Sequence, residues 1–71
     1  MSILENWKLN GKKDITDPGQ MNHCLSEAIE TRDKKTIIEL YDADKCDWEC
    51  EDSLFNEYDL LVDMANEIVF E

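Results

Sequence analysis

The sequence contains no long hydrophobic run and no sorting signal. Its apolar stretches are far shorter than the roughly 18 residues that a membrane-spanning helix requires. The first residues lack the basic and apolar regions of a signal peptide. The three cysteines are an odd number, which together with the missing secretion signal favours reduced thiols over a disulfide framework. We therefore expect a cytoplasmic protein that does not contact a membrane.

Residue patterns that carry catalysis are also scarce. The chain has no glycine-rich phosphate loop, and its single histidine, His23, has no serine nucleophile beside it. The neighbouring Cys24 would leave a helix in a direction about 100° away from His23. The negative charge of the chain would raise the pKa of a thiol, which makes it a weaker nucleophile. We expect no enzymatic activity and no cofactor.

Zinc is the metal that the residue inventory fits best. His23, Cys24, Cys46 and Cys50 provide the nitrogen and sulfur ligands that tetrahedral zinc prefers. The cysteine pair at 46 and 50 lacks the glycine turn of structural zinc knuckles, and the adjacent His23 and Cys24 would point about 100° apart on a helix. Cys24 equally fits the apolar face of a helix. A calcium loop that begins at Asp42 would lack its glycine at the sixth place and its glutamate at the twelfth. We therefore favour packed or partly exposed thiols and predict no metal site.

Basic residues are nearly absent from the second half of the chain. Residues 1–35 contain six acids and six bases, whereas residues 36–71 contain twelve acids and a single base, Lys45. The whole formal charge of −11 therefore lies in the second half. Such asymmetry indicates an interaction surface, whereas a dispersed excess would indicate only solubility. Because an acidic field repels phosphate, we do not expect direct binding of nucleic acid.

The chain does contain enough apolar side chains for one small folded domain. Apolar residues make up 42% of the sequence, and in three segments they recur at helical spacing. We predict a single all-α domain over residues 1–71, with helices at 18–32, 33–43 and 53–70. Residues 2–13 are predicted to form an arm, a short helix or a hairpin around Asn10-Gly11 that docks Trp7 on the core.

The predicted helices begin at recognisable signals. Residues 17–20, Asp-Pro-Gly-Gln, combine an N-cap acid, a proline at the first helical position and a capping-box glutamine. Asp33 is expected to cap the second helix, and Asp52 or Ser53 the third. Between the second and third helices, residues 42–52 are predicted to form an ordered loop with one helical turn.

The predicted last helix carries a row of acids with no basic residue between them. Asp59, Asp63 and Glu67 recur every four residues, so their carboxylates should lie about 6 Å apart on the face opposite the apolar stripe. A merely solvated helix surface normally mixes both signs of charge, whereas this row resembles the phosphates along one nucleic-acid strand. The predicted partner-binding residues are Asp47, Trp48, Glu49, Asp52, Asp59, Asp63 and Glu67. Acids expected to extend this field are Glu39, Asp42, Asp44, Glu51 and Glu57.

Two functions fit this pattern. In the first, the acidic surface occupies the basic groove of a nucleic-acid-binding protein and excludes its DNA or RNA. In size and charge the chain resembles the small acidic proteins with which bacteriophages inhibit host defence nucleases, transcription or repair. In the second, the charge serves solubility, and the protein is a helical adaptor that binds a partner through an apolar surface around Trp48. Trp48 equally fits a role in closing the helical hairpin, and a homodimer would cover apolar surface left open by so small a core.

Overall fold

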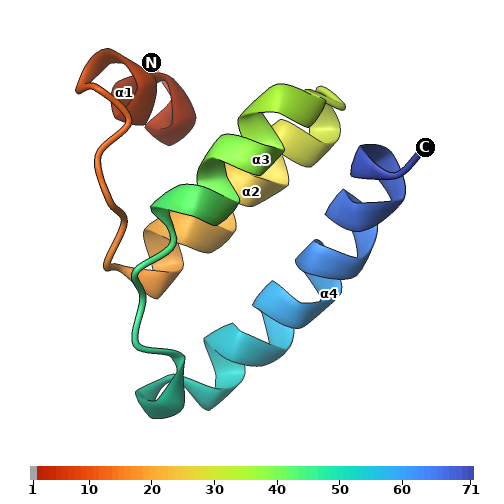
Figure 1. The fold of residues 1–71 in the computed structure, drawn as a ribbon. Helices are drawn as coiled ribbons and strands as arrows, with labels where there is room; N and C mark the ends of the chain where they lie inside the picture. Colours follow the sequence, from red (N-terminus) through yellow and green to blue (C-terminus); the bar gives the residue numbers. More distant parts are fainter. Residues whose placement is uncertain (1) are drawn as a thin grey trace.

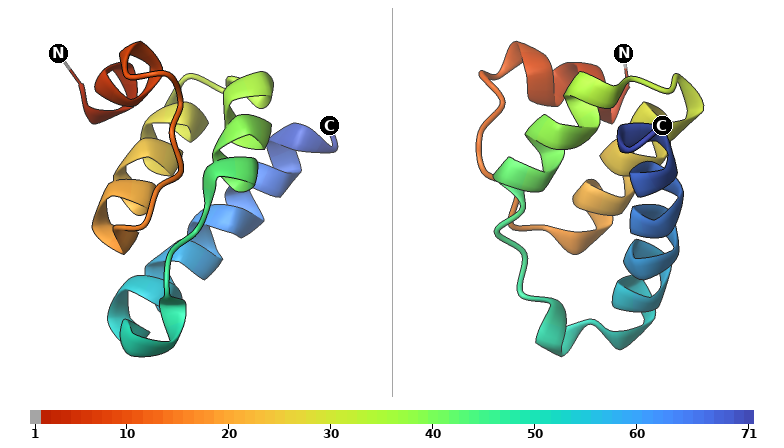
Figure 2. Two further views of the ribbon diagram at one scale, coloured as in Figure 1. Left: turned by 60° about the vertical axis from the view of Figure 1, so that its left-hand side comes forward. Right: turned by 45° about the vertical axis from the view of Figure 1, so that its right-hand side comes forward.

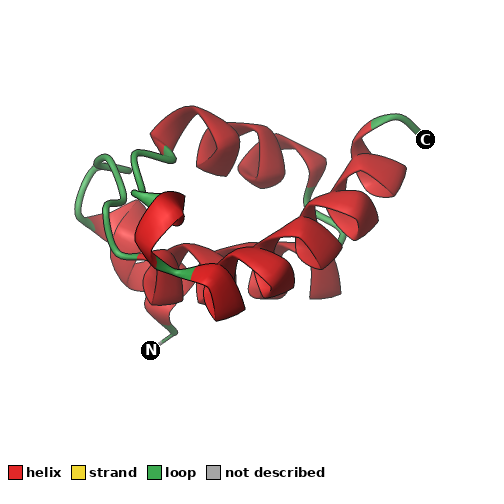
Figure 3. Cartoon of the chain, turned by 90° about the horizontal axis from the view of Figure 1, so that it is seen from below, coloured by secondary structure: helices red, strands yellow, loops and turns green. Residues whose placement is uncertain are grey.

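The computed structural model describes residues 2–71, which form four α-helices and one short 3₁₀ turn (Figure 1). The elements are α1 (Ile3–Leu9), α2 (Pro18–Glu30), α3 (Lys34–Ala43), η1 (Trp48–Cys50) and α4 (Asp52–Val69). The predicted all-α class is confirmed, and residues 2–71 contain helices and loops without a strand (Figure 3). The three predicted helices and the helical turn in the 42–52 loop are all present.

Of the forms predicted for the N-terminal segment, the structure has the short helix that docks Trp7 on the core, and not the hairpin around Asn10-Gly11. Asn10-Gly11 instead ends α1, because Gly11 adopts a left-handed φ of +90° that a helix C-terminus uses as readily as a hairpin does. The amide of Gly11 donates to the Lys8 carbonyl (3.2 Å), and the amide of Lys12 donates to the Trp7 carbonyl (3.0 Å). These two bonds satisfy carbonyls that the end of a helix leaves free.

The two helices of the α2–α3 hairpin begin at their predicted caps. The side chain of Asp17 accepts from the Gly19 amide (3.1 Å) at the start of α2. Asp33 accepts from the Thr36 amide (3.2 Å) at the start of α3. Between the helices Arg32 takes a left-handed φ of 53°, which places the turn where the sequence predicts it. α2 ends at Glu30, two residues earlier than predicted, since this turn closes its last carbonyls.

α4 begins one residue earlier than predicted and without a side-chain cap. The predicted cap at Asp52 or Ser53 is wrong, because Glu51 occupies the cap position and makes no side-chain capping bond. The preceding η1 turn leads directly into α4 through the backbone of this residue. Its amide donates to the Trp48 carbonyl (3.2 Å), and its carbonyl accepts from the Phe55 amide (2.7 Å).

α2 is the central helix of the domain. It contacts α1, α3 and α4, and Figure 2 shows α1 and α4 on different sides of the α2–α3 pair. The core therefore lies around the buried face of α2. Its members from the four α-helices are Leu4, Trp7, Met21, Cys24, Leu25, Ala28, Ile37, Leu40, Ala43, Leu61, Ala65 and Ile68.

A two-bond bridge joins the two long connections of the chain. The amide of Ile15 donates to the Ala43 carbonyl (2.8 Å), and the Ile15 carbonyl accepts from the Lys45 amide (2.9 Å). The Ile15 side chain is fully buried in the core. This bridge fixes the first residues of the connection between α3 and α4. It therefore also fixes the position of Asp44, which lies between the two bonded residues Ala43 and Lys45.

Candidate protein-interaction surface

The acidic row on α4, Asp59, Asp63 and Glu67, is exposed along its whole length. Its members lie on the side of α4 away from the buried residues of that helix. Asp52, also exposed, precedes Asp59 by two helical turns on the same side, about 10 Å along the axis. Within residues 2–71, none of these four acids has a lysine, arginine or histidine nitrogen at ion-pair distance. The row is therefore a line of uncompensated charge.

Two further predicted acids lie in the turn that leads into α4. Asp47 and Glu49 are both exposed, and the Asp47 side chain accepts from the Glu49 amide (3.2 Å). This bond caps η1 while leaving the charge of Asp47 at the surface. The six predicted acids thus follow one continuous segment, from η1 to the last turn of α4.

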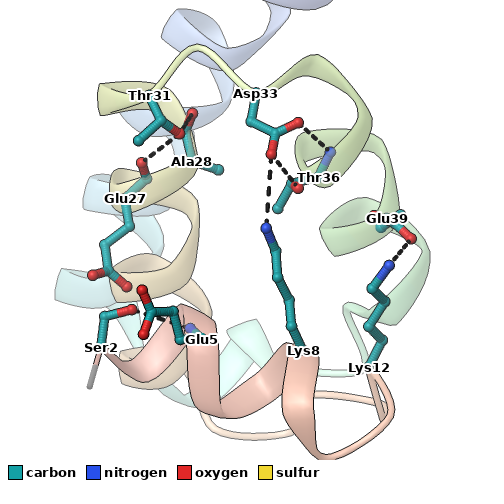
Figure 4. A network of polar contacts seen from close by, with 10 residues as sticks. All are labelled: Ser2, Glu5, Lys8, Lys12, Glu27, Ala28, Thr31, Asp33, Thr36 and Glu39. Atoms are coloured by element: carbon teal, nitrogen blue, oxygen red, sulfur yellow. Dashed lines mark hydrogen bonds and ion pairs between the residues drawn. The ribbon is translucent and has the colours of Figure 1, made fainter.

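Three of the six basic residues of the first half pair with acids that do not belong to the row. Lys8 of α1 lies 3.7 Å from Asp33, and Lys12 lies 2.6 Å from Glu39 (Figure 4). Arg32 forms a two-bond pair with the terminal Glu71, at 2.8 Å to each carboxylate oxygen. Glu39 therefore does not extend the acidic field, because Lys12 compensates its charge. Lys8 in α1 and Lys12 just after it instead link this segment to the start and middle of α3.

Asp44 also departs from its predicted place in the acidic field. Its carboxylate accepts from the Tyr58 hydroxyl (2.7 Å), the Trp48 indole nitrogen (3.3 Å) and the Cys46 amide (3.1 Å). Three donors from three different positions thus satisfy a half-buried carboxylate. Burial and this hydrogen bond raise the pKa of the Tyr58 phenol. Asp44 is a structural residue that joins the α3–α4 connection to α4.

Trp48 packs inward instead of projecting from its loop. Its ring stacks on Tyr58 with centroids 4.2 Å apart and an interplanar angle of 25°, and Phe55 lies 6.1 Å away. The half-buried indole covers the core beneath the η1 turn. Of the two roles that the sequence allows for Trp48, this packing favours closure of the domain over contact with a partner. Its indole proton is also already donated to Asp44.

Replacement of Asp44 tests the polar hub, the name used here for the Asp44 carboxylate with the donors that bond to it. We expect Asp44→Ala to lower the free energy of unfolding by about 2 kcal/mol, because the Tyr58 and Trp48 donors lose their charged acceptor. Asp42→Ala is the matched control, since Asp42 is an exposed acid two residues away. Urea unfolding of the two variants gives the comparison. Equal unfolding free energies of Asp44→Ala and Asp42→Ala would show that the hub contributes nothing to stability.

The four candidate zinc ligands do not come together. Cys24 is buried in the core, His23 is exposed, and the Cys46 thiol donates to the Ile15 carbonyl (3.4 Å). Cys50 is exposed on η1. Across residues 2–71, no three histidine, cysteine or acidic residues are grouped so that they could hold a metal ion. The thiols are separate features of the fold.

Two of the thiols are held in their protonated form. Burial, and then the charge of Glu27, raise the pKa of Cys24 from 9.0 to about 11. Burial first, and then the nearby Asp44 carboxylate, raise the pKa of Cys46 to about 12. A thiol with so high a pKa is a poor nucleophile at neutral pH.

These raised pKa values predict alkaline destabilisation. Above about pH 9 the unfolded chain releases thiol protons that the folded chain retains, so stability present below that pH is lost between about pH 9 and pH 12. The raised pKa of Tyr58 acts in the same direction. We expect Cys46→Ala to show a smaller loss of unfolding free energy between neutral pH and about pH 10 than the native chain. Cys50→Ala is the control; an identical slope in both variants would contradict this origin.

The structure also exposes apolar side chains on α4 that the sequence analysis missed. Leu60 is 65% exposed and Met64 is 45% exposed, and both lie beside the acidic row. The signal was their four-residue spacing, one position after Asp59 and Asp63, which places them at the border of the apolar stripe. The surface of α4 is therefore mixed, with acidic and apolar side chains next to each other.

Comparison with known proteins leaves the surface to be interpreted from its own residues. No protein-family model, no curated protein and no solved structure matches the chain. None of the helices in residues 2–71 combines the length and apolar character needed to cross a bilayer.

Proposed function

We propose that this protein binds the basic nucleic-acid-binding surface of another protein and excludes nucleic acid from it. The observation that carries the proposal is the exposed acidic row on α4, which has no basic partner within residues 2–71. Like charges at four-residue spacing destabilise a helix by a few tenths of a kcal/mol per pair. Since no base on α4 relieves this repulsion, a cationic ligand would relieve it on binding.

The helix gives the charges a fixed geometry. Carboxylates on successive turns stand about 6 Å apart on a rigid axis, so a groove that grips a phosphate backbone meets charges at regular intervals. The packing of α4 on α2 holds that axis in place before binding, which reduces the entropy lost on association. The field of the second half of the chain also steers a basic partner toward this side and raises the rate of encounter.

The proposed class is an inhibitor of the type that bacteriophages direct at host defence, transcription or nucleases. It rests on the size of the chain, its charge of −11 and the exposed row. The alternative of an adaptor that binds through Trp48 has less support, because the Trp48 ring is stacked on Tyr58 and its nitrogen is bonded to Asp44. We therefore propose that the partner contacts the exposed acids of α4 and of the η1 turn, and not Trp48.

Affinity capture at two ionic strengths tests the proposal. The immobilised protein is incubated with a bacterial lysate at low salt, and bound proteins are eluted by raising the salt and identified by mass. We expect nucleic-acid-handling proteins with basic surfaces to be retained and then released, because screening weakens the contact between exposed charges. Retention of a partner that salt does not release and that has no basic surface would contradict the proposal.

A further inference from the structure

The apolar side chains of α4 form a row that descends from open surface into a hollow. Leu60, Met64 and Ile68 follow at four-residue spacing, and their exposed fractions fall from 65% to 45% to 6%. Met64 and Ile68 line a hollow of about 400 Å³ between the ends of α2 and α4. On the α2 side this hollow is lined by Ile29 and Arg32. The hollow continues along α4 as the exposed row, and the two together, about 12 Å long, are called the groove below.

Acids border this groove along α4. Glu57 and Asp63 lie three residues before and after Leu60, and Glu67 lies three residues after Met64, so each is a neighbour on the helix surface. The one base at the hollow, Arg32, is paired with Glu71 at 2.8 Å. The exposed row is therefore apolar with a negatively charged border, whereas the hollow at its end has a mixed lining. This lining consists of the apolar Ile29, Met64 and Ile68 and the charged Arg32, Glu67 and Glu71.

A second copy of this chain is a poor occupant for such a groove. A two-fold dimer brings the same surface of each subunit together, so the acidic row of one copy would face that of the other. Like charges facing each other across an interface cost affinity, and no base on α4 relieves them. The charge of the border instead selects a partner segment that carries Lys or Arg beside its apolar side chains.

We propose that the groove binds an amphipathic helix whose apolar stripe is bordered by Lys and Arg. Its apolar side chains lie along Leu60 and Met64 and enter the hollow beside Ile29, while its cations face Asp63 and Glu67. This arrangement follows the way in which amphipathic helices dock with apolar side chains at successive turns. The inference rests on the proposed function, and it adds an apolar contribution to binding that salt does not screen.

Peptide binding tests this inference. The probe is a synthetic helix of leucine and lysine with its leucines on one face, and the control peptide has the same composition in scrambled order. Fluorescence anisotropy measures both affinities at low and high salt. We expect the amphipathic peptide to bind the native protein about tenfold more tightly than the scrambled one at high salt, because only it presents a continuous apolar face. Equal affinities of the two peptides at high salt would overturn the inference.

Surface variants locate the binding site. Leu60→Gln with Met64→Gln is expected to remove the preference for the amphipathic peptide. Leu9→Gln with Ile38→Gln should retain it, because these exposed apolar side chains lie on α1 and α3. Matching far-ultraviolet circular dichroism verifies that both double variants are folded. Retention of the preference in the α4 variant would overturn the inference. The inference would also be overturned if the native protein were a dimer and the α4 variant a monomer, because a second copy would then occupy the groove.

The two proposals fail in different ways. If the groove plays no role, the two peptides bind alike at high salt as well as at low salt, and neutralising the acidic row still weakens the binding of both at low salt. If the acidic row plays no role, neutralising it leaves the low-salt affinity of the scrambled peptide unchanged, which contradicts the proposed function itself.

Discussion

Neutralising the acidic row is expected to weaken binding to a basic partner by at least about tenfold at low salt, or ~1.4 kcal/mol. The variant carries Asp59→Asn, Asp63→Asn and Glu67→Gln, which preserve side-chain size and remove three charges. Because the two like-charge pairs disappear, the free energy of unfolding should rise by a few tenths of a kcal/mol per pair. Loss of affinity would therefore accompany a slightly more stable helix. Titration calorimetry at two salt concentrations and thermal unfolding measure the two effects.

A control variant separates position from total charge. Glu5→Gln, Asp14→Asn and Glu30→Gln also remove three exposed acids, but from the first half of the chain, where none caps a helix through its side chain. This control should keep most of the affinity and its salt dependence. Equal losses in the two triple variants would show that net charge alone attracts the partner, and that the row on α4 has no special role.

Truncation of Trp48 is expected to have the largest effect on stability. Trp48→Ala removes the ring stacked on Tyr58, the cover over the core and one donor to Asp44. For a half-buried tryptophan we expect a loss of about 2–3 kcal/mol. In a domain of this size that loss lowers the Tm by roughly 10–20 °C. Thermal unfolding followed by circular dichroism measures the change.

The same residue separates the two functional hypotheses. Trp48→Phe keeps an aromatic ring on Tyr58 and should recover part of the lost stability. If the partner binds α4, the folded fraction of both Trp48 variants should bind with native affinity. An adaptor that uses Trp48 as its contact would lose affinity in a fully folded Trp48→Phe variant. A Trp48→Ala variant as stable as the native chain would contradict the packing role.

Local signals predicted most of this fold, because helix ends are decided by near neighbours. Asp17 and Asp33 cap the helices that they were expected to cap, since each side chain needs only an amide two or three residues later. At Asn10-Gly11 the local signal left a short helix and a hairpin both open. A left-handed glycine suits a hairpin turn and a helix end equally well, and the buried Trp7 selected the helix.

The unpredicted features depend on contacts between distant residues. The bridge from Ile15 to Ala43 and Lys45 has no sequence pattern, because a single bridge needs neither alternation nor a strand. It positions Asp44 to accept from Tyr58, which turned an expected surface charge inward. For the candidate surface, helical spacing predicted the acidic row correctly as a geometric feature. The exposure of Leu60 and Met64, the apolar neighbours of the row, could be known only from the packing of α4 on α2.

The most direct test of the central claim is competition between this protein and nucleic acid for one partner. A basic nucleic-acid-binding protein captured from lysate is bound to a labelled oligonucleotide, and this protein is then titrated in while the label is followed by anisotropy. We expect complete displacement of the oligonucleotide, with a midpoint that shifts to a higher concentration of this protein when the acidic row is neutralised. A stable ternary complex that retains both the oligonucleotide and this protein would contradict mimicry of the phosphate backbone.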